Sequence, residues 1–189
     1  MRHGLVAALS LLIAACGGAF GTDGSVHGIS ADMESGVMRV AVSDDQSASL
    51  AELFLSSAPD VCTLGQSVHA LNGAQVIQIR LAIGLPNGSF TTPNVGGRFD
   101  ITAIGGPGHK MASAAFDRLP TCGPQSLPLV EEAAIDGSVT IEELDLDSSG
   151  PVRMRGSYEL LFDHSAGSVT GTFDTSGCDG FYPVLQFCN

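Results

Sequence analysis

The chain has 189 residues, with 8 Lys and Arg against 20 Asp and Glu, so that its formal net charge is −12. A chain this acidic cannot replace the counterions on phosphate, which excludes nucleic acid as a partner, and its apolar content of 44% excludes a disordered polymer. The length fits one domain with a sizeable hydrophobic core.

Residues 1–15 have the organisation of a signal peptide. Arg2 supplies positive charge, and residues 5–15 form an unbroken run of small and apolar side chains. As an α-helix this run would span about 16 Å, which is about half of the bilayer core. It therefore predicts a cleaved signal and not a transmembrane helix.

Residues 13–16, Ile-Ala-Ala-Cys, resemble the bacterial lipobox, in which an apolar residue and two small residues precede an obligatory cysteine. The resemblance implies that the Cys16 thiol is alkylated by a diacylglycerol, that the peptide is cut before Cys16, and that the new amino group is acylated, for example with palmitate. Two or three acyl chains hold a protein on a bilayer far more firmly than one. The alternative is an ordinary secretory signal that is cleaved after Ala19.

Both alternatives place the domain outside the cytoplasm, in the cell envelope. In the lipoprotein sorting rule, an aspartate after the acylated cysteine retains the protein in the inner membrane. Gly17 follows Cys16 here. The resemblance therefore implies the outer membrane, with the bilayer engaged through the acylated Cys16.

Residues 16–36 are rich in Gly, Ser, Ala and Asp and contain few large apolar residues. This composition predicts a flexible tether that follows the lipidated Cys16. In residues 37–189, alternating runs are separated by Gly, Pro, Asn and Asp, which is typical of one all-β domain.

The strongest alternation occurs in residues 38–42 and 77–83, which predict strands. Residues 50–55 fit a strand or a short helix, and we expect a strand. Residues 99–104 and 110–116 are weaker candidates that flank a Gly/Pro-rich turn.

The clearest unit lies near the C-terminus, where residues 163–167 join two alternating segments. One face of each segment is apolar or glycine: Tyr158, Leu160 and Phe162 in the first, then Val169, Gly171 and Phe173 in the second. This pattern predicts an antiparallel hairpin. About eight short strands with frequent turns predict an antiparallel β-sandwich or a small β-barrel.

Four cysteines remain when Cys16 is set aside: Cys62, Cys122, Cys178 and Cys188. An even number in an exported chain predicts disulfides that staple the domain. Three pairings are possible, and we favour Cys62–Cys122 with Cys178–Cys188, because the other pairings require the C-terminal tail to reach across the domain. The absence of a C-x-x-C motif disfavours a zinc site.

Four segments carry a family resemblance: residues 56–62, 137–141, 156–162 and 167–174. Cys178 follows the last of these segments. Together they resemble uncharacterised lipoproteins of Gram-negative bacteria with high genomic GC content. The resemblance covers about half of the mature chain. It implies an all-β envelope domain, and it brings no catalytic residue and no cofactor.

A calcium-loop pattern occurs at Asp145, Asp147 and Ser149, which are followed by Gly150. Oxygen ligands at the first, third and fifth positions and glycine at the sixth suit Ca²⁺. The twelfth position is Gly156 in place of the usual glutamate, so a hairpin turn is the alternative interpretation, and we assign no metal.

Other motifs support no chemistry. Residues 105–110 look like a phosphate loop, but Pro107 removes an amide donor and no Ser or Thr follows the lysine. Asp163, His164 and Ser165 are adjacent, whereas a catalytic triad is assembled across a fold. The glutamate pairs at 131–132 and 142–143 are typical of a solvated face, and a glycosidase is disfavoured because Trp is absent and Tyr is scarce.

The sequence therefore predicts a non-catalytic envelope lipoprotein whose β domain is a binding or structural module for a protein or small-molecule partner. The alternative is a lipocalin-like carrier, which requires an open lumen of several hundred Å³. A module without a lumen would instead have its interior filled by six residues: Ile77, Ile79, Leu81, Tyr158, Leu160 and Phe162.

Overall fold

A computed structural model describes residues 20–44, 46–64, 73–102, 105–121, 129–148 and 150–178. Within these ranges the chain forms twelve β-strands and one helical turn, α1 (Val61–Leu64). The prediction of an all-β domain is confirmed.

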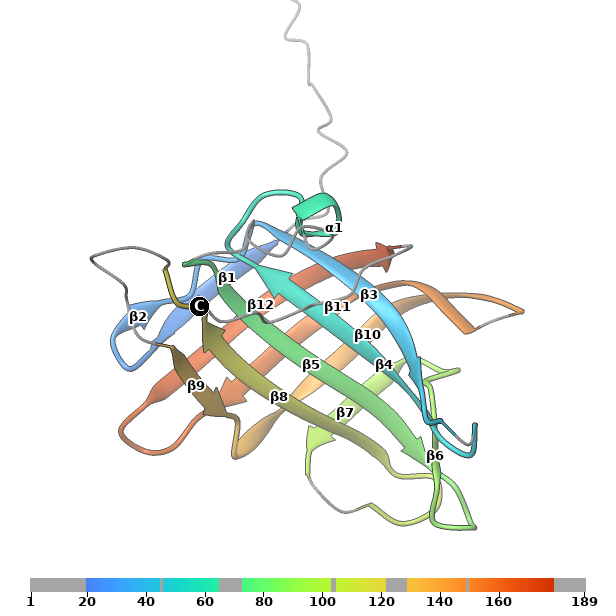
Figure 1. The fold of residues 1–189 in the computed structure, drawn as a ribbon. Helices are drawn as coiled ribbons and strands as arrows, with labels where there is room; N and C mark the ends of the chain where they lie inside the picture. Colours follow the sequence, from blue (N-terminus) through green and yellow to red (C-terminus); the bar gives the residue numbers. More distant parts are fainter. Residues whose placement is uncertain are drawn as a thin grey trace, which may run out of the picture.

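Eight strands form a closed barrel in the order β11-β10-β7-β8-β5-β4-β3-β12, and β12 pairs again with β11. The strands at the front and the back of the barrel cross obliquely (Figure 1). The front strands are β3 (Ser35–Val42), β4 (Ser49–Ser56), β5 (Gln75–Gly84) and β8 (Lys110–Arg118). The remaining barrel strands are β7 (Gly97–Ile101), β10 (Asp136–Asp147), β11 (Gly150–Leu161) and β12 (Gly167–Gly177).

Four shorter strands are added to this barrel. β1 pairs with β12 and β2 with β1, whereas β6 pairs with β5 and β9 with β8. Their bounds are β1 (Gly21–Val26), β2 (Ile29–Ser30), β6 (Phe90–Thr91) and β9 (Val130–Ala133).

The barrel consists of two antiparallel sheets that meet at two short parallel seams. At the first seam, β7 joins β8 through the pairs Asp100–Met111 and Ile101–Ala112. At the second seam, β12 joins β3 through the pairs Ser176–Val37 and Gly177–Met38. The sequence predicted a sandwich or a small barrel, and these seams turn a two-sheet arrangement into a closed barrel.

The strand predictions are confirmed where the alternation is regular. β11 and β12 form the expected antiparallel hairpin, in which Tyr158 lies opposite Gly171 and Leu160 opposite Val169. Residues 50–55 lie within β4 and form a strand.

The predicted tether at residues 16–36 is wrong in its second half, because residues 21–30 contain β1 and β2. Val26 is fully buried. Gly24 has a φ of +120°, and a Cβ at this position would lie 2.2 Å from the Ser168 carbonyl oxygen. Glycine here therefore permits close approach of two strands, and the composition that suggested a tether reflects close backbone packing. Ordered structure begins well before Val37.

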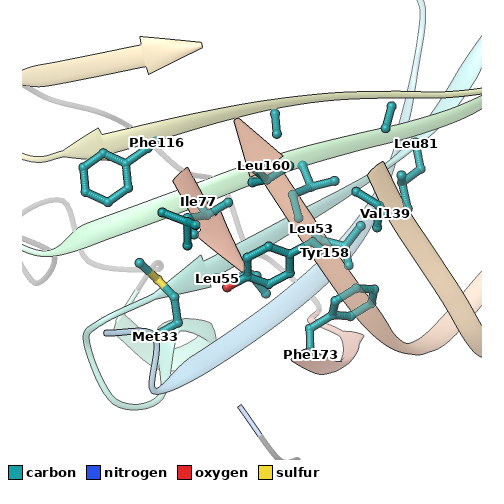
Figure 2. Close-up of a cluster of buried hydrophobic side chains, with 14 of the residues drawn as sticks. Met33, Leu53, Leu55, Ile77, Leu81, Phe116, Val139, Tyr158, Leu160 and Phe173 are labelled. Atoms are coloured by element: carbon teal, nitrogen blue, oxygen red, sulfur yellow. The ribbon is translucent and has the colours of Figure 1, made fainter. Parts of the chain in front are cut away.

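The barrel interior is filled by apolar side chains from both sheets. All six residues predicted to fill it are buried: Ile77, Ile79, Leu81, Leu160 and Phe162 have no exposed surface, and Tyr158 is 3% exposed. Figure 2 shows Leu53, Leu55 and Ile77 facing Leu160 and Tyr158 from the opposite sheet. The barrel is thus built around a hydrophobic core.

A second apolar cluster lies on the outer side of β3, β4 and β5. It comprises Val37, Phe54, Val61, Val76 and Leu119, and Cys62 and Cys178 pack against it. This cluster joins α1 to the neighbouring strands.

Cys62 forms a disulfide with Cys178 across 116 residues of sequence, with a Cα–Cα distance of 5.8 Å. The favoured pairing of Cys62 with Cys122 and Cys178 with Cys188 is therefore wrong. The parallel seam between β12 and β3 brings the end of β12 next to the strand on which α1 packs. Cys122 and Cys188 lie outside the described residues.

Candidate functional site

An open groove of about 450 Å³ lies on the outer wall of the barrel, across β7, β10, β11 and β12. Its lining is dominated by short hydroxyl side chains and comprises Arg98, Ser138, Thr140, Ser157, Tyr158, Glu159, Thr170, Gly171 and Thr172.

The strand register places these hydroxyl side chains in two rows. Paired residues in adjacent strands point to the same side of a sheet. One row runs from Arg98 through Thr140 and Ser157 to Thr172. The second row passes through Ser138, Glu159 and Thr170. The apolar residues between these positions point into the core, so the groove is the polar face of the same alternation that builds the interior.

Several groove hydroxyls have no hydrogen-bond partner among the described residues. Ser138 is only 6% exposed, yet its side chain makes no hydrogen bond there. The same holds for Thr140, Ser157 and Thr170, whereas the Thr172 hydroxyl accepts a hydrogen bond from the Gly21 amide at 3.1 Å. Thr140 and Ser157 are half-buried and Thr170 is exposed, so these hydroxyls are available to a ligand or to water.

The groove carries one cation and one anion. The Arg98 Nε donates to Asp100 Oδ1 at 2.7 Å. Glu159 makes no ion pair with the described residues. The lining contains no histidine, cysteine or lysine among the described residues.

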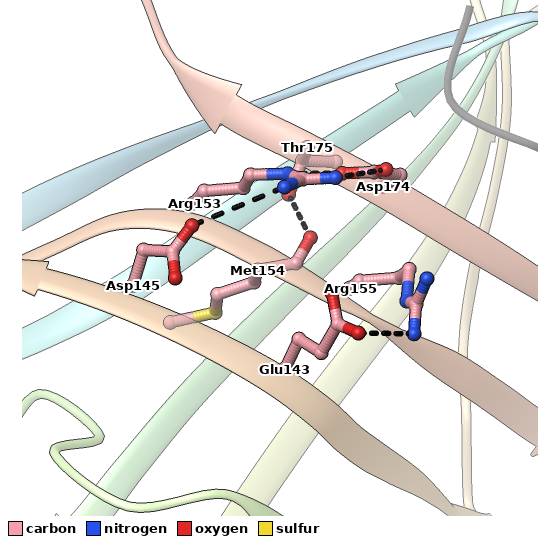
Figure 3. Close-up of polar contacts among 7 residues, drawn as sticks. All are labelled: Glu143, Asp145, Arg153, Met154, Arg155, Asp174 and Thr175. Atoms are coloured by element: carbon pink, nitrogen blue, oxygen red, sulfur yellow. Dashed lines mark hydrogen bonds and ion pairs between the residues drawn. The ribbon is translucent and has the colours of Figure 1, made fainter.

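Two arginines on β11, Arg153 and Arg155, lie beyond the groove and form ion pairs (Figure 3). Arg153 Nη2 lies 2.7 Å from Asp174 Oδ2, and Nη1 lies 4.0 Å from Asp145. The hydrogen bonds from Arg153 lower the pKa of Asp174. Arg155 forms an ion pair with Glu143. These pairs leave Arg98 as the guanidinium that lines the groove.

The calcium candidates lie at the tip of the β10–β11 hairpin. Asp145 and Asp147 belong to β10, and Asp145 faces Arg153. Ser149 lies outside the described residues. In the part of the chain that the structure describes, no group of three or more His, Cys, Asp or Glu side chains is arranged to hold a metal ion.

The other motifs do not converge on a site. Gly108 and His109 lie in a turn that leads into β8, where the Lys110 Nζ donates to the Gly96 carbonyl. Asp163 and His164 lie in the exposed turn between β11 and β12. The lipidation candidate Cys16 lies outside the described residues.

The two glutamates of the 131–132 pair point to different partners. Glu132 contacts His27 Nε2 at 2.9 Å, whereas Glu131 lies opposite Asp117 in β8. Asp117 is 8% exposed. Burial, and then the nearby charge of Glu131, raise the pKa of Asp117 to about 6. No sequence pattern marks this group, because its neighbour Glu131 is set by the pairing of β8 with β9.

Asp117→Asn is expected to stabilise the protein near neutral pH. The pKa of Asp117 is raised on folding, so the folded state binds its proton more tightly and stability falls as pH rises from about 4 to about 6. Replacing the carboxylate should increase the free energy of unfolding by on the order of 2 kcal/mol near pH 7 and by much less near pH 4. Urea denaturation at several pH values measures this difference.

The matched control is Asp44→Asn, at an exposed position after β3. It should change the free energy of unfolding by less than about 0.5 kcal/mol. Equal stabilisation by Asp117→Asn at both pH values would show that the charge of Asp117 is not responsible.

The Glu52 carboxylate is a second buried acid, and its role is structural. Glu52 is 4% exposed on the outer face of β4. Its oxygens accept hydrogen bonds from Arg39 Nε at 2.6 Å and from Arg80 Nε at 2.9 Å. Because both arginines are paired to it across adjacent strands, this cluster ties β3, β4 and β5 together.

Comparison of the chain with protein-family models, with curated proteins and with solved structures gives no match. Within the described ranges, no helix has the length and apolar character that a bilayer crossing requires.

Proposed function

We propose that this protein is an envelope lipoprotein that displays a non-catalytic binding module, and that its ligand binds in the groove on the outer wall of the barrel. The observation that carries this proposal is Ser138, which is 6% exposed, lines the groove and makes no side-chain hydrogen bond to a described residue. The Ser138 oxygen is not among the buried side-chain atoms that lack a partner, so it meets solvent in the groove, and a ligand hydroxyl could take the place of water there.

The packing of the core favours a ligand site on the outer wall of the barrel over a carrier that encloses its ligand inside the barrel. A carrier needs an internal volume that can enclose its ligand. Here Leu53, Ile77 and Leu160 have no exposed surface and belong to one cluster of buried side chains (Figure 2). This burial supports a ligand site on the outer wall over a lipocalin-like site inside the barrel.

A lipid on Cys16 would hold the barrel close to the membrane. Phe20 packs against the core and follows Cys16 by only four residues. A fully extended chain of this length reaches about 14 Å. The end of the barrel at which Phe20 approaches Gly36 would then be the anchored end. The module would lie near the bilayer surface, without a long flexible linker.

Metabolic labelling with an alkyne fatty acid tests the anchor. Wild-type protein should be labelled and recovered with membranes, whereas Cys16→Ser should carry no label. Ala19→Val is the matched control, because it blocks the competing cleavage site and leaves the lipobox intact. Labelling of Cys16→Ser, or loss of processing in Ala19→Val, would contradict a lipid at Cys16.

A further inference from the structure

We infer that the groove on β7, β10, β11 and β12 binds a neutral saccharide of one or two rings. This inference rests on the proposed function, because it names the ligand class of the same site.

The hydrogen-bonding groups of the groove match those of an alcohol. A Ser or Thr hydroxyl has one donor and two acceptor positions, and Ser138, Thr140, Ser157 and Thr170 all have these positions open to a ligand. Sugar hydroxyls likewise donate and accept, so each contact can be satisfied in both directions. A ligand with only acceptors or only donors would leave part of this set unpaired.

The charge of the groove disfavours an anion. Glu159 lines it, and Asp100 engages the Nε of Arg98, the guanidinium of the lining. The whole chain has a net charge of −12, which repels phosphate or a carboxylate ligand at long range. Glu159 can accept hydrogen bonds from two sugar hydroxyls, and the remaining Arg98 nitrogens can donate to a ring or glycosidic oxygen.

The size and shape of the groove fit this ligand class. Adjacent strands are about 4.8 Å apart, which is comparable to the width of a pyranose ring, and the volume of about 450 Å³ accommodates one or two such rings. The methyl groups of Thr140, Thr170 and Thr172 offer apolar contact to the C–H face of a sugar. All of these side chains stand on paired strands, so little conformational entropy is lost on binding.

Binding is expected to be weak and dependent on the hydroxyl groups. The chain has no Trp, so the stacking on indole that strengthens many sugar sites is missing, and a Kd of about 1 mM is expected. Removing one neutral hydrogen bond should weaken binding about fivefold. Removing the charge of Glu159 should weaken it about tenfold.

The experiment titrates the purified full-length protein with maltose, cellobiose and N-acetylglucosamine by isothermal calorimetry, with inorganic phosphate and spermidine as charged probes. The variants are Ser138→Ala, Thr140→Val and Glu159→Gln. Thr140→Val preserves side-chain shape and strand propensity, so it keeps the test valid if another variant fails to fold. The matched control is Ser113→Ala, at an exposed position on β8 in the other sheet.

At least one saccharide should bind at millimolar concentration. Its affinity should fall by the stated factors in the groove variants and stay unchanged in Ser113→Ala. Absence of saccharide binding would overturn the inference, as would saccharide affinity that Thr140→Val leaves unchanged. Binding of phosphate or spermidine that is lost in the groove variants, without saccharide binding, would also overturn it. Fatty-acid labelling at Cys16 is independent of these results, so a failure of the anchor and a failure of the ligand class are distinguishable.

Discussion

The double variant Cys62→Ser, Cys178→Ser is expected to lose about 4 kcal/mol of its free energy of unfolding. The disulfide closes a loop of 116 residues, and a cross-link of that length restricts the unfolded chain by about 4–5 kcal/mol in the chain-entropy model. It also holds α1 against the outer cluster that contains Val37 and Phe54. Urea denaturation under non-reducing conditions measures the loss.

The single variant Cys62→Ser checks the pairing. It should release a thiol at Cys178, which alkylation and peptide mass spectrometry identify. Release of a thiol at Cys122 would contradict the Cys62–Cys178 bond and support the pairing favoured by the sequence. The sequence predicts that all four cysteines are oxidised, so we expect neither Cys122 nor Cys188 to be alkylated in the wild-type protein.

Phe116→Ala is expected to cost about 3–5 kcal/mol of stability. Phe116 has no exposed surface and packs edge-on against Phe162, with ring centroids 6.4 Å apart. Truncation would leave a cavity and remove this aromatic contact. Thermal and urea unfolding at one fixed pH measure the change.

The matched control is Phe90→Ala, because Phe90 lies on β6 and is 43% exposed. It should cost less than about 1 kcal/mol. A small loss for Phe116→Ala, similar to that of Phe90→Ala, would mean that the interior is open around Phe116 and would favour the carrier.

Regular alternation was sufficient to predict much of the fold. In residues 77–83 of β5, 150–160 of β11 and 167–173 of β12, every second residue is apolar or a glycine, and a half-buried strand is the conformation that separates such faces. The polar faces of these strands could be assigned for the same reason. Residues 50–55 are less regular, and their strand conformation follows from pairing with β3 and β5 on both sides.

The errors arose where long-range contacts override composition. Residues 21–30 look like a linker, yet they form β1 and β2 because Gly24 lets the chain lie close to β12. The Cys62–Cys178 bond depends on the parallel seam between β12 and β3. Two residue pairs form that seam, and no local pattern marks them.

The groove illustrates the same limit on sequence reasoning. Thr170 and Thr172 are recognisable as the polar face of a predicted strand. Their alignment with Ser157 on β11 and with Ser138 and Thr140 on β10 depends on the register of three strands. A shift of one residue would turn these side chains to the opposite face, so the site becomes visible only once the barrel is assembled.

The most direct test of a filled barrel with an external binding site is amide chemical-shift mapping by NMR, with the saccharide that binds most tightly in calorimetry as the ligand. The largest shifts should fall on Ser138, Thr140, Ser157 and Thr170, while Leu53 and Ile77 stay unchanged. Shifts that concentrate on Leu53 and Ile77 and spare the groove would place the ligand inside the barrel and contradict the account.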